Sequence, residues 1–170
     1  MPSICLSTAT SLTGLTKRTL WRRIDNGSLT AINATELGGK TRVRLADIVP
    51  LACVALEPED LRVILDADGG DAVAQCDLAL IFLAAHRSAA AVTWLMLAAK
   101  QFYPDAMCHL GRCYLSGEGV ARDENAGILW LSQAAAKGHP LARNLMLFLQ
   151  SPKGQQLPAA HEPEALDAEG

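Results

Sequence analysis

The sequence predicts a mainly α-helical fold in which a small N-terminal unit with a β-hairpin precedes a stack of α-α hairpins. The N-terminal third contains two short helical patterns joined by a turn, followed by alternating apolar residues near a Gly-Gly pair. The remainder contains a pattern that recurs after 32 to 36 residues. We expect one unit over residues 1–56, a helical repeat unit over residues 57–150, and a disordered tail over residues 151–170.

Charge is distributed unevenly along the chain. Residues 1–50 carry seven basic and three acidic side chains, a net charge of +4, whereas the remainder carries eight basic and fifteen acidic side chains, a net charge of -7. A polyanionic partner is therefore expected to bind to the N-terminal unit.

Composition favours a soluble protein of the cytoplasm. Half of the 170 residues are hydrophobic, which is enough to bury a core, but no apolar stretch reaches the length of a membrane span. The N-terminus lacks the charged start of a secretory signal. The five cysteines form an odd set without a Cys-x-x-Cys motif, which fits a reducing compartment better than a disulfide framework.

The first two helices are separated by a short turn. Ala9 and Leu12 recur at helical spacing, Ser7 is a candidate N-cap, and Gly14 marks the expected end of the first helix. Thr16 is the candidate N-cap of the second helix. This pattern predicts a helix-turn-helix.

The second helix is strongly basic. Leu20 and Ile24 lie four residues apart and are expected to face the core, and Asn26-Gly27 is expected to end the helix. We expect Trp21 to be half-buried. The remaining surface carries four basic residues: Lys17, Arg18, Arg22 and Arg23.

Two strand-like runs follow around Gly38-Gly39. In the second run, KTRVRL, two apolar residues alternate with Arg42 and Arg44, which places both arginines on the outer face of a predicted hairpin. A third short helix is expected to begin near Asp47, with Ile48 facing inward.

The order of these elements over residues 7–54 resembles that of the MerR-like and excisionase-like winged helix-turn-helix domains of bacteria. The shared features are a helix, a Gly, a small polar cap, a basic helix with an aromatic residue, a Gly-x-Leu exit, a Gly-tipped wing and an acidic-capped helix. A basic run alone more often forms a solvated helix face, but this ordered set favours nucleic-acid binding.

The resemblance implies a contact surface for double-stranded DNA. The expected base contacts are Arg18, Thr19 and Arg22. The expected phosphate contacts are Lys17, Arg23, Lys40, Arg42 and Arg44. One such unit has a small footprint, so useful specificity would require a homodimer or a partner protein.

Residues 106–142 closely resemble the Sel1-like repeat, an α-α hairpin related to the tetratricopeptide repeat. A degenerate copy precedes them, and a third copy begins after Pro140 and stops after one helix. The resemblance implies packing roles for Trp94, Leu110, Gly111, Tyr114, Trp130, Ala134 and Ala135. A helix over residues 58–68 is expected to cover one end of the array and a helix over residues 141–150 the other; the alternative is that the array continues into a second protomer. We expect the repeat unit and the N-terminal unit to have separate cores.

The chemistry-bearing residues of the repeat unit do not predict a reaction centre. Cys108 and Cys113 are poorly placed to converge with His109 on a metal, so both cysteines are expected to be buried apolar residues. His86 is expected on the surface. With no nucleotide-binding or hydrolase motif, we expect no enzymatic activity, metal or cofactor.

These observations predict a DNA-binding transcriptional regulator, or a DNA-tethered adaptor, whose repeats bind a protein or peptide. The alternative is a protein-interaction scaffold that does not bind DNA, in which the winged helix serves as a second protein-binding module.

Overall fold

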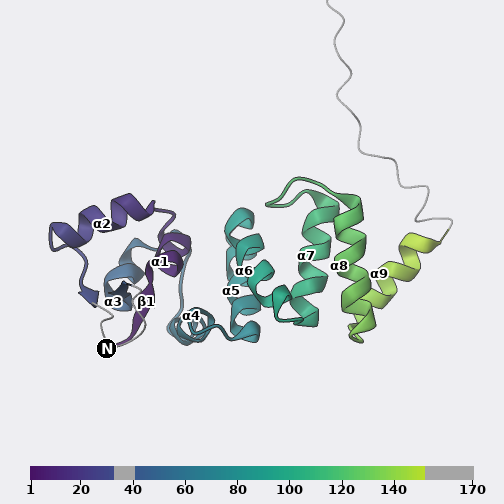
Figure 1. The fold of residues 1–170 in the computed structure, drawn as a ribbon, viewed down its shortest axis with the longest axis horizontal. Helices are drawn as coiled ribbons and strands as arrows, with labels where there is room; N and C mark the ends of the chain where they lie inside the picture. Colours follow the sequence, from purple (N-terminus) through teal and green to yellow (C-terminus); the bar gives the residue numbers. More distant parts are fainter. Residues whose placement is uncertain (33–40, 152–170) are drawn as a thin grey trace, which may run out of the picture.

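A computed structural model describes residues 1–32 and 41–151. The chain forms an elongated molecule, with the small N-terminal unit at one end and helices stacked side by side toward the other (Figure 1). Lys40, Gly38-Gly39 and the tail from residue 152 onward lie outside the described residues.

The N-terminal unit combines helices with a small sheet. Its elements are β1 (Ser3–Cys5), α1 (Leu6–Thr13), α2 (Lys17–Asp25), β2 (Ala31–Ile32), β3 (Arg42–Arg44), α3 (Leu45–Ile48) and the 3-10 helix η1 (Val49–Leu51). The strand order is β1-β3-β2, and β3 pairs antiparallel with both neighbours. In the central register Val43 lies opposite Ile4 on one side and Ala31 on the other. The strand β1 adds a third member to the expected hairpin.

Capping residues recognised in the sequence correctly predicted the end of α1 and the start of α2. The Thr16 hydroxyl accepts a hydrogen bond of 3.2 Å from the backbone N–H of Thr19, so Thr16 caps α2 as expected. Helix α1 ends at Gly14. The expectation for Ser7 is wrong, because α1 begins two residues earlier and Cys5 occupies the N-cap position.

The remainder is helical and forms a stack of successive α-α hairpins. Its helices are α4 (Asp60–Asp68), α5 (Ala72–Ala84), α6 (Ser88–Lys100), α7 (Pro104–Ser116), α8 (Glu124–Ala136) and α9 (Pro140–Gln150). The pairs α5–α6 and α7–α8 form hairpins that pack in chain order, and α9 packs on α8. Ala74, Ala106 and Ala142 occupy equivalent positions in α5, α7 and α9, and all three are buried.

Small residues let α7 and α8 approach closely. A Cβ atom added to Gly111 would lie 2.9 Å from the carbonyl oxygen of Gly127, and one added to Gly127 would lie 3.0 Å from the carbonyl oxygen of Gly111. Neither helix therefore tolerates a side chain at this crossing without moving.

The side chains expected to form the repeat core differ in depth. Leu110, Gly111 and Ala134 are buried, and Trp94 is only 4% exposed. The other three are partly buried and pack against the core: Tyr114, Trp130 and Ala135. The indole Nε1 of Trp94 is buried and has no hydrogen-bond partner among the described residues.

The two units do not have separate cores. The buried apolar side chains form one cluster that runs from Ile4 in β1 to Ala142 in α9. Helix α4 joins the two parts, because it packs against both β1 and α5. The expected boundary near residue 56 therefore separates two segments of sequence that share buried surface.

Helix α9 differs from its repeat counterpart α7 on one side. Around Gly111, which packs against α8 together with Leu115, α7 carries mostly apolar residues: Met107, Cys108, Gly111, Tyr114 and Leu115. The residues of α9 at these positions, 36 residues later, are Arg143, Asn144, Leu147, Gln150 and Ser151. Four of the five are polar or charged. Helix α9 is therefore more polar than α7 on this side, as in the helix that ends a solenoid, although Leu147 is 68% exposed.

Candidate protein-binding face and basic helix

Equivalent outward positions of α5, α7 and α9 form a surface that we call the outer stripe. Each helix contributes residues at spacing i, i+4 and i+7, which lie on one helix face. The outer stripe consists of Val73, Asp77 and Leu80 of α5, Asp105, His109 and Arg112 of α7, and Leu141, Leu145 and Phe148 of α9.

Apolar side chains dominate the two flanks of the outer stripe. Val73 is 48% exposed and Leu80 is 38% exposed on α5, and Leu141 is 44% exposed and Phe148 is 47% exposed on α9. Single exposed apolar residues are common on protein surfaces, but their recurrence at matched repeat positions indicates a contact surface.

The α7 part of the outer stripe carries charged residues, and one of them, Asp105, already interacts with two other side chains. Asp105 accepts a hydrogen bond of 2.9 Å from the hydroxyl of Tyr103 and lies 3.0 Å from Nε2 of His139. Burial, together with the hydrogen bond to Asp105, raises the pKa of Tyr103 to about 12. Arg112 is exposed and forms no ion pair or hydrogen bond with another side chain in the described ranges. Arg112 is therefore available to an acidic partner group.

His109 lies between Asp105 and Arg112 on the outer stripe. Burial lowers the pKa of His109, and the positive charge of Arg112 lowers it further, against the opposing effect of Asp105. We therefore expect His109 to be neutral at pH 7.

His139 ties the start of α9 to the start of α7. Its Nδ1 accepts a hydrogen bond of 3.2 Å from the backbone N–H of Ala142 and caps α9, while its Nε2 faces Asp105. Gln101 ties the preceding connection to α5 through a hydrogen bond of 2.9 Å to Gln75. These contacts hold α5, α7 and α9 in fixed relation to one another.

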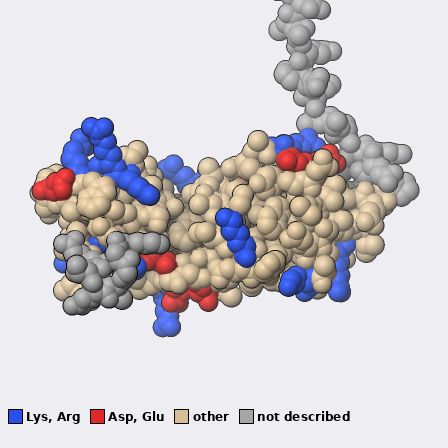
Figure 2. All heavy atoms as spheres, viewed as in Figure 1, with Lys and Arg blue, Asp and Glu red and all other residues tan. Residues whose placement is uncertain are grey.

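The second candidate surface lies on α2 at the opposite end of the molecule. Lys17, Arg18 and Arg22 are exposed and Arg23 is half-buried, and none of these four residues forms an ion pair within residues 1–32 or 41–151. Figure 2 shows a group of basic side chains over this helix. The helix packs on the core through Leu20, which has no exposed surface.

Trp21 separates two hollows on α2. Its side chain is exposed, at 43%, whereas the sequence predicted half-buried packing. One hollow of about 460 Å³ is lined by Arg18, Thr19, Trp21, Arg22 and Asp25. The other, of about 430 Å³, is lined by Cys5, Leu6, Ser7, Lys17, Trp21 and Thr41. The residues expected to contact bases therefore lie together beside the exposed indole.

The two arginines of β3 are engaged within the molecule. Arg42 lies 2.6 Å from Asp68 and also donates to Ser3, and Arg44 lies 2.8 Å from Asp47. The sequence placed both arginines on the outer face of the hairpin as phosphate contacts. Because each has an intramolecular carboxylate partner, we leave Arg42 and Arg44 out of the basic surface of α2.

Asp68 is the centre of the junction between the two units. Its side chain has no exposed surface. One carboxylate oxygen accepts hydrogen bonds from the backbone N–H of Cys5 at 3.0 Å, from the Cys5 thiol at 2.6 Å and from the Thr8 hydroxyl, and the other accepts from Arg42. Burial raises the pKa of Asp68, but these hydrogen bonds and the charge of Arg42 outweigh burial, so the net pKa lies below its ordinary value.

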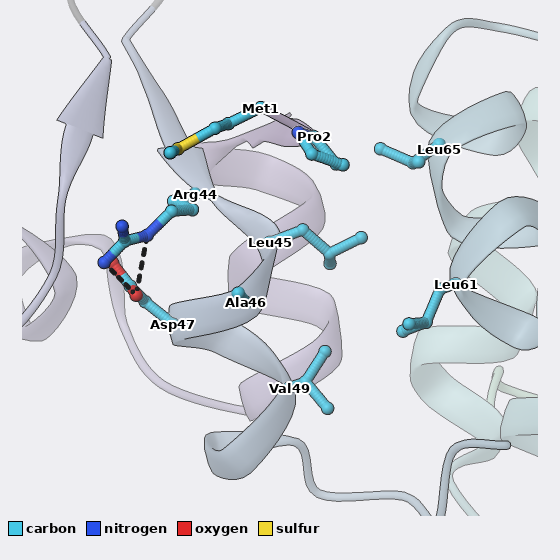
Figure 3. A pocket seen from close by; sticks show the side chains of 9 residues that line it. All are labelled: Met1, Pro2, Arg44, Leu45, Ala46, Asp47, Val49, Leu61 and Leu65. Atoms are coloured by element: carbon cyan, nitrogen blue, oxygen red, sulfur yellow. Dashed lines mark hydrogen bonds and ion pairs between the residues drawn. The ribbon is translucent and has the colours of Figure 1, made fainter. Parts of the chain in front are cut away.

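An apolar hollow of about 410 Å³ lies at the same junction. Leu45 and Val49 form one wall and Leu61 and Leu65 of α4 form the other (Figure 3). The charged residues at its edge, Arg44 and Asp47, bind each other. This hollow fits an uncharged apolar group.

Two of the cysteines that were considered as metal ligands, Cys108 and Cys113, lie on α7. Cys108 and Cys113 are buried, as expected, and burial raises the pKa of both thiols. Within the described ranges, no group of three or more His, Cys, Asp or Glu side chains is placed to hold a metal ion.

His86 is exposed in the connection between α5 and α6. No helix in the described part of the chain is both long and apolar enough to span a bilayer.

Sequence reasoning missed the outer stripe and Asp68. The repeat relates each residue of α7 to the residue 36 positions later in α9. Comparing the outward positions of the two helices at this offset would have revealed the stripe. Asp68 gave no such signal, because it lies 63 residues from Cys5 and 26 residues from Arg42.

Comparisons with known proteins bear on the repeat unit. A crystal structure of a Sel1 repeat protein from Oxalobacter formigenes is 23% identical, with a TM-score of 0.49 over 82% of this chain and 87% of that chain. The comparison with curated proteins gives no match. Residues 104–139 match the family model of the Sel1 repeat, a range that does not include the N-terminal unit. The matched range is the hairpin of α7 and α8, so the similarity to Sel1 repeats is shown for this hairpin.

Proposed function

We propose that this protein is an interaction scaffold whose repeat unit binds a segment of a partner protein across the outer stripe. The observation that carries this proposal is the recurrence of exposed apolar side chains at matched positions of α5 and α9, with Arg112 between them. Stacked hairpins form extended surfaces of this kind, and Sel1 repeats suggest protein binding.

The outer stripe favours a particular partner chemistry. Its third row consists of Leu80, Arg112 and Phe148, one residue from each helix. An extended segment that crosses the three helices would place an acidic side chain near Arg112 and apolar side chains near Leu80 and Phe148. The Arg112 guanidinium favours a carboxylate, because such charge-assisted hydrogen bonds are about twice as strong as neutral ones.

Affinity capture with full-length variants tests this proposal. We expect Phe148→Asp to lose partners that the unaltered chain retains, because a charge on the outer stripe opposes apolar contact. Leu129→Asp is the matched control, since Leu129 is 56% exposed on α8, outside the outer stripe. Equal capture by both variants would exclude the outer stripe as the partner-binding face.

DNA binding by α2 is a second candidate function. It is favoured by the four basic residues of α2 that have no ion-pair partner in the described part of the chain. In this proposal Arg18, Thr19 and Arg22 contact bases and Lys17 and Arg23 contact phosphates. It also includes Lys40, which lies outside the described residues.

Binding of the full chain to random duplex DNA at several salt concentrations tests the second candidate. If roughly four phosphates are neutralised, a plot of the logarithm of the binding constant against the logarithm of the salt concentration should have a slope of about -3.6. Arg22→Ala should weaken binding, whereas Arg62→Ala on α4, where Arg62 is 86% exposed, should not. Absence of binding at low salt would leave α2 as a protein-binding or solvated surface.

A further inference from the structure

We propose that the acidic tail of this chain docks on its own outer stripe and competes there with the partner segment. The docking segment is residues 157–166, which read LPAAHEPEAL. The proposal rests on the proposed scaffold function only in assigning the same surface to both ligands.

The last described residue, Ser151, follows directly on the α9 part of the outer stripe. The described chain ends at Ser151, three residues after Phe148. Nineteen residues follow Ser151, and an extended chain advances about 3.3 Å per residue. Helices α9 and α5 are joined by four packed pairs, α9–α8, α8–α7, α7–α6 and α6–α5. Packed neighbours lie about 8–10 Å apart, so this span is at most about 40 Å. The extended tail, at roughly 60 Å, is long enough to cross from α9 over α7 to α5.

The chemistry of the tail matches the third row of the outer stripe. Leu157 and Leu166 flank two acids, Glu162 and Glu164, as Phe148 and Leu80 flank Arg112. If the tail runs away from α9, Leu157 meets Phe148 first, the two glutamates reach Arg112 and Leu166 reaches Leu80.

Charge selects the third row over the first. Asp105 in the first row (Val73, Asp105 and Leu141) and Asp77 in the second row would repel the acidic tail, whereas Arg112 in the third row has no ion-pair partner among the described residues. Residues 152–170 contain four acids, Glu162, Glu164, Asp167 and Glu169, against one basic residue, Lys153. An acid that docks at Arg112 therefore gains attraction that the first row does not offer.

Zero-length cross-linking of the full-length Arg112→Lys variant tests this proposal. A carbodiimide joins a carboxylate to an amine only when the two are in contact, so the lysine introduced at position 112 should couple to Glu162 or Glu164. The native lysines Lys17 and Lys100 serve as internal controls for non-specific coupling. We expect the peptide joined through position 112 to exceed either control several-fold, and to fall toward their level when Phe148→Ser or Leu80→Ser is added.

Three results would overturn the proposal. One is coupling at position 112 no greater than at Lys17. Another is coupling that Phe148→Ser and Leu80→Ser leave unchanged while circular dichroism shows both variants folded. The third is coupling that joins isotope-labelled to unlabelled chains in a mixture, because the tail would then bind a second copy.

Partner binding separates this proposal from the scaffold function. A tethered ligand acts at an effective concentration of order mM, so replacing the four tail acids by amides should raise the apparent partner affinity by about two- to tenfold. Partner capture that depends on Phe148, combined with absent coupling at position 112, would overturn the tail proposal alone. Specific coupling with no partner loss in Phe148→Asp would overturn the scaffold function alone.

Discussion

The carboxylate of Asp68 at the end of α4 and the guanidinium of Arg42 in β3 meet at 2.6 Å, although 26 residues separate them in the chain. The Asp68 side chain is fully buried, whereas that of Arg42 is 27% exposed. Because Asp68 also accepts hydrogen bonds from Cys5 and Thr8, one carboxylate holds β1, α1 and β3 against the first helix of the repeat unit. The two units are therefore mechanically linked.

Asp68→Asn should destabilise the whole molecule. Removing one partner of a buried ion pair costs about 3–5 kcal/mol, because the other charge loses its compensation. Urea unfolding measures this loss. Asp66→Asn is the control, since Asp66 is 51% exposed and lies 3.5 Å from Arg62, and such surface pairs contribute about 0–1 kcal/mol. Equal unfolding midpoints for the two variants would contradict a stabilising role for Asp68.

The contribution of Asp68 to stability should also depend on pH. Its pKa is lowered in the folded state, so the folded protein holds the ionised form more strongly than the unfolded chain does. The stabilisation is present above the unfolded pKa of about 3.9 and is lost as pH falls through the lower folded pKa. In acid unfolding experiments, the Asp68→Asn variant should therefore lose less stability between about pH 4 and lower pH than the unaltered chain does.

Replacement of the two repeat tryptophans should rank in the order of their burial. Trp94 is 4% exposed, whereas Trp130 is only partly buried. Trp94→Ala should therefore cost about 3–5 kcal/mol through cavity formation, and Trp130→Ala should cost less. The repeat pattern alone favours the opposite order, because Trp130 belongs to the better-preserved copy. Thermal melting of both variants decides between the two orders.

Gly119 should be far less tolerant of a side chain than Gly27. Both have positive φ, +74° and +76° respectively, so backbone strain alone predicts similar costs. However, a Cβ atom on Gly119 would lie 2.3 Å from the carbonyl of Ser88 at the start of α6, whereas nothing lies within 4 Å at Gly27. We expect Gly119→Ala to lose about 1–3 kcal/mol more than Gly27→Ala in chemical unfolding. Matching losses would show that α6 moves freely away from this loop.

His109 should make the repeat unit less stable in mild acid. Its folded pKa is lowered, so the unfolded chain binds the proton more strongly. Stability is therefore full above the unfolded value of about 6.5 and declines as pH falls below it. The surrounding charges are Arg112 and His139, which oppose protonation, and Asp105, which favours it.

Urea midpoints of the unaltered chain and His109→Gln, measured between about pH 5 and pH 8, test this dependence. The variant should show a shallower decline. An identical decline in both proteins would assign the acid sensitivity to other groups.

Sequence patterns were sufficient where the determining contacts are local. The Thr16 cap depends on a residue three positions away, and the repeat hairpins follow from small and aromatic residues at fixed spacing. Gly111 was identified in this way because only a residue without a side chain fits beside Gly127.

The same patterns were insufficient where distant segments meet. The residues around Arg42 in the sequence do not show whether its side chain is free to bind a phosphate or forms an ion pair with Asp68. Arg44 presents the same ambiguity, although its partner Asp47 lies only three residues away. The expectation of separate cores failed for a related reason, because α4 was treated as an end cap of the array and not as a shared wall.

The polar flank of α9 determines how copies of this molecule can meet. A solenoid whose last helix kept the apolar lining of α7 would offer a surface on which another hairpin could stack, and such head-to-tail contact has no built-in end. Arg143, Asn144 and Gln150 occupy this flank, and Leu147 fills the position at which α7 requires Gly111 for close approach. A second hairpin approaching this flank would therefore meet polar side chains, and the exposed Leu147 where α8 meets Gly111, so close end-to-end stacking of copies is disfavoured on this side.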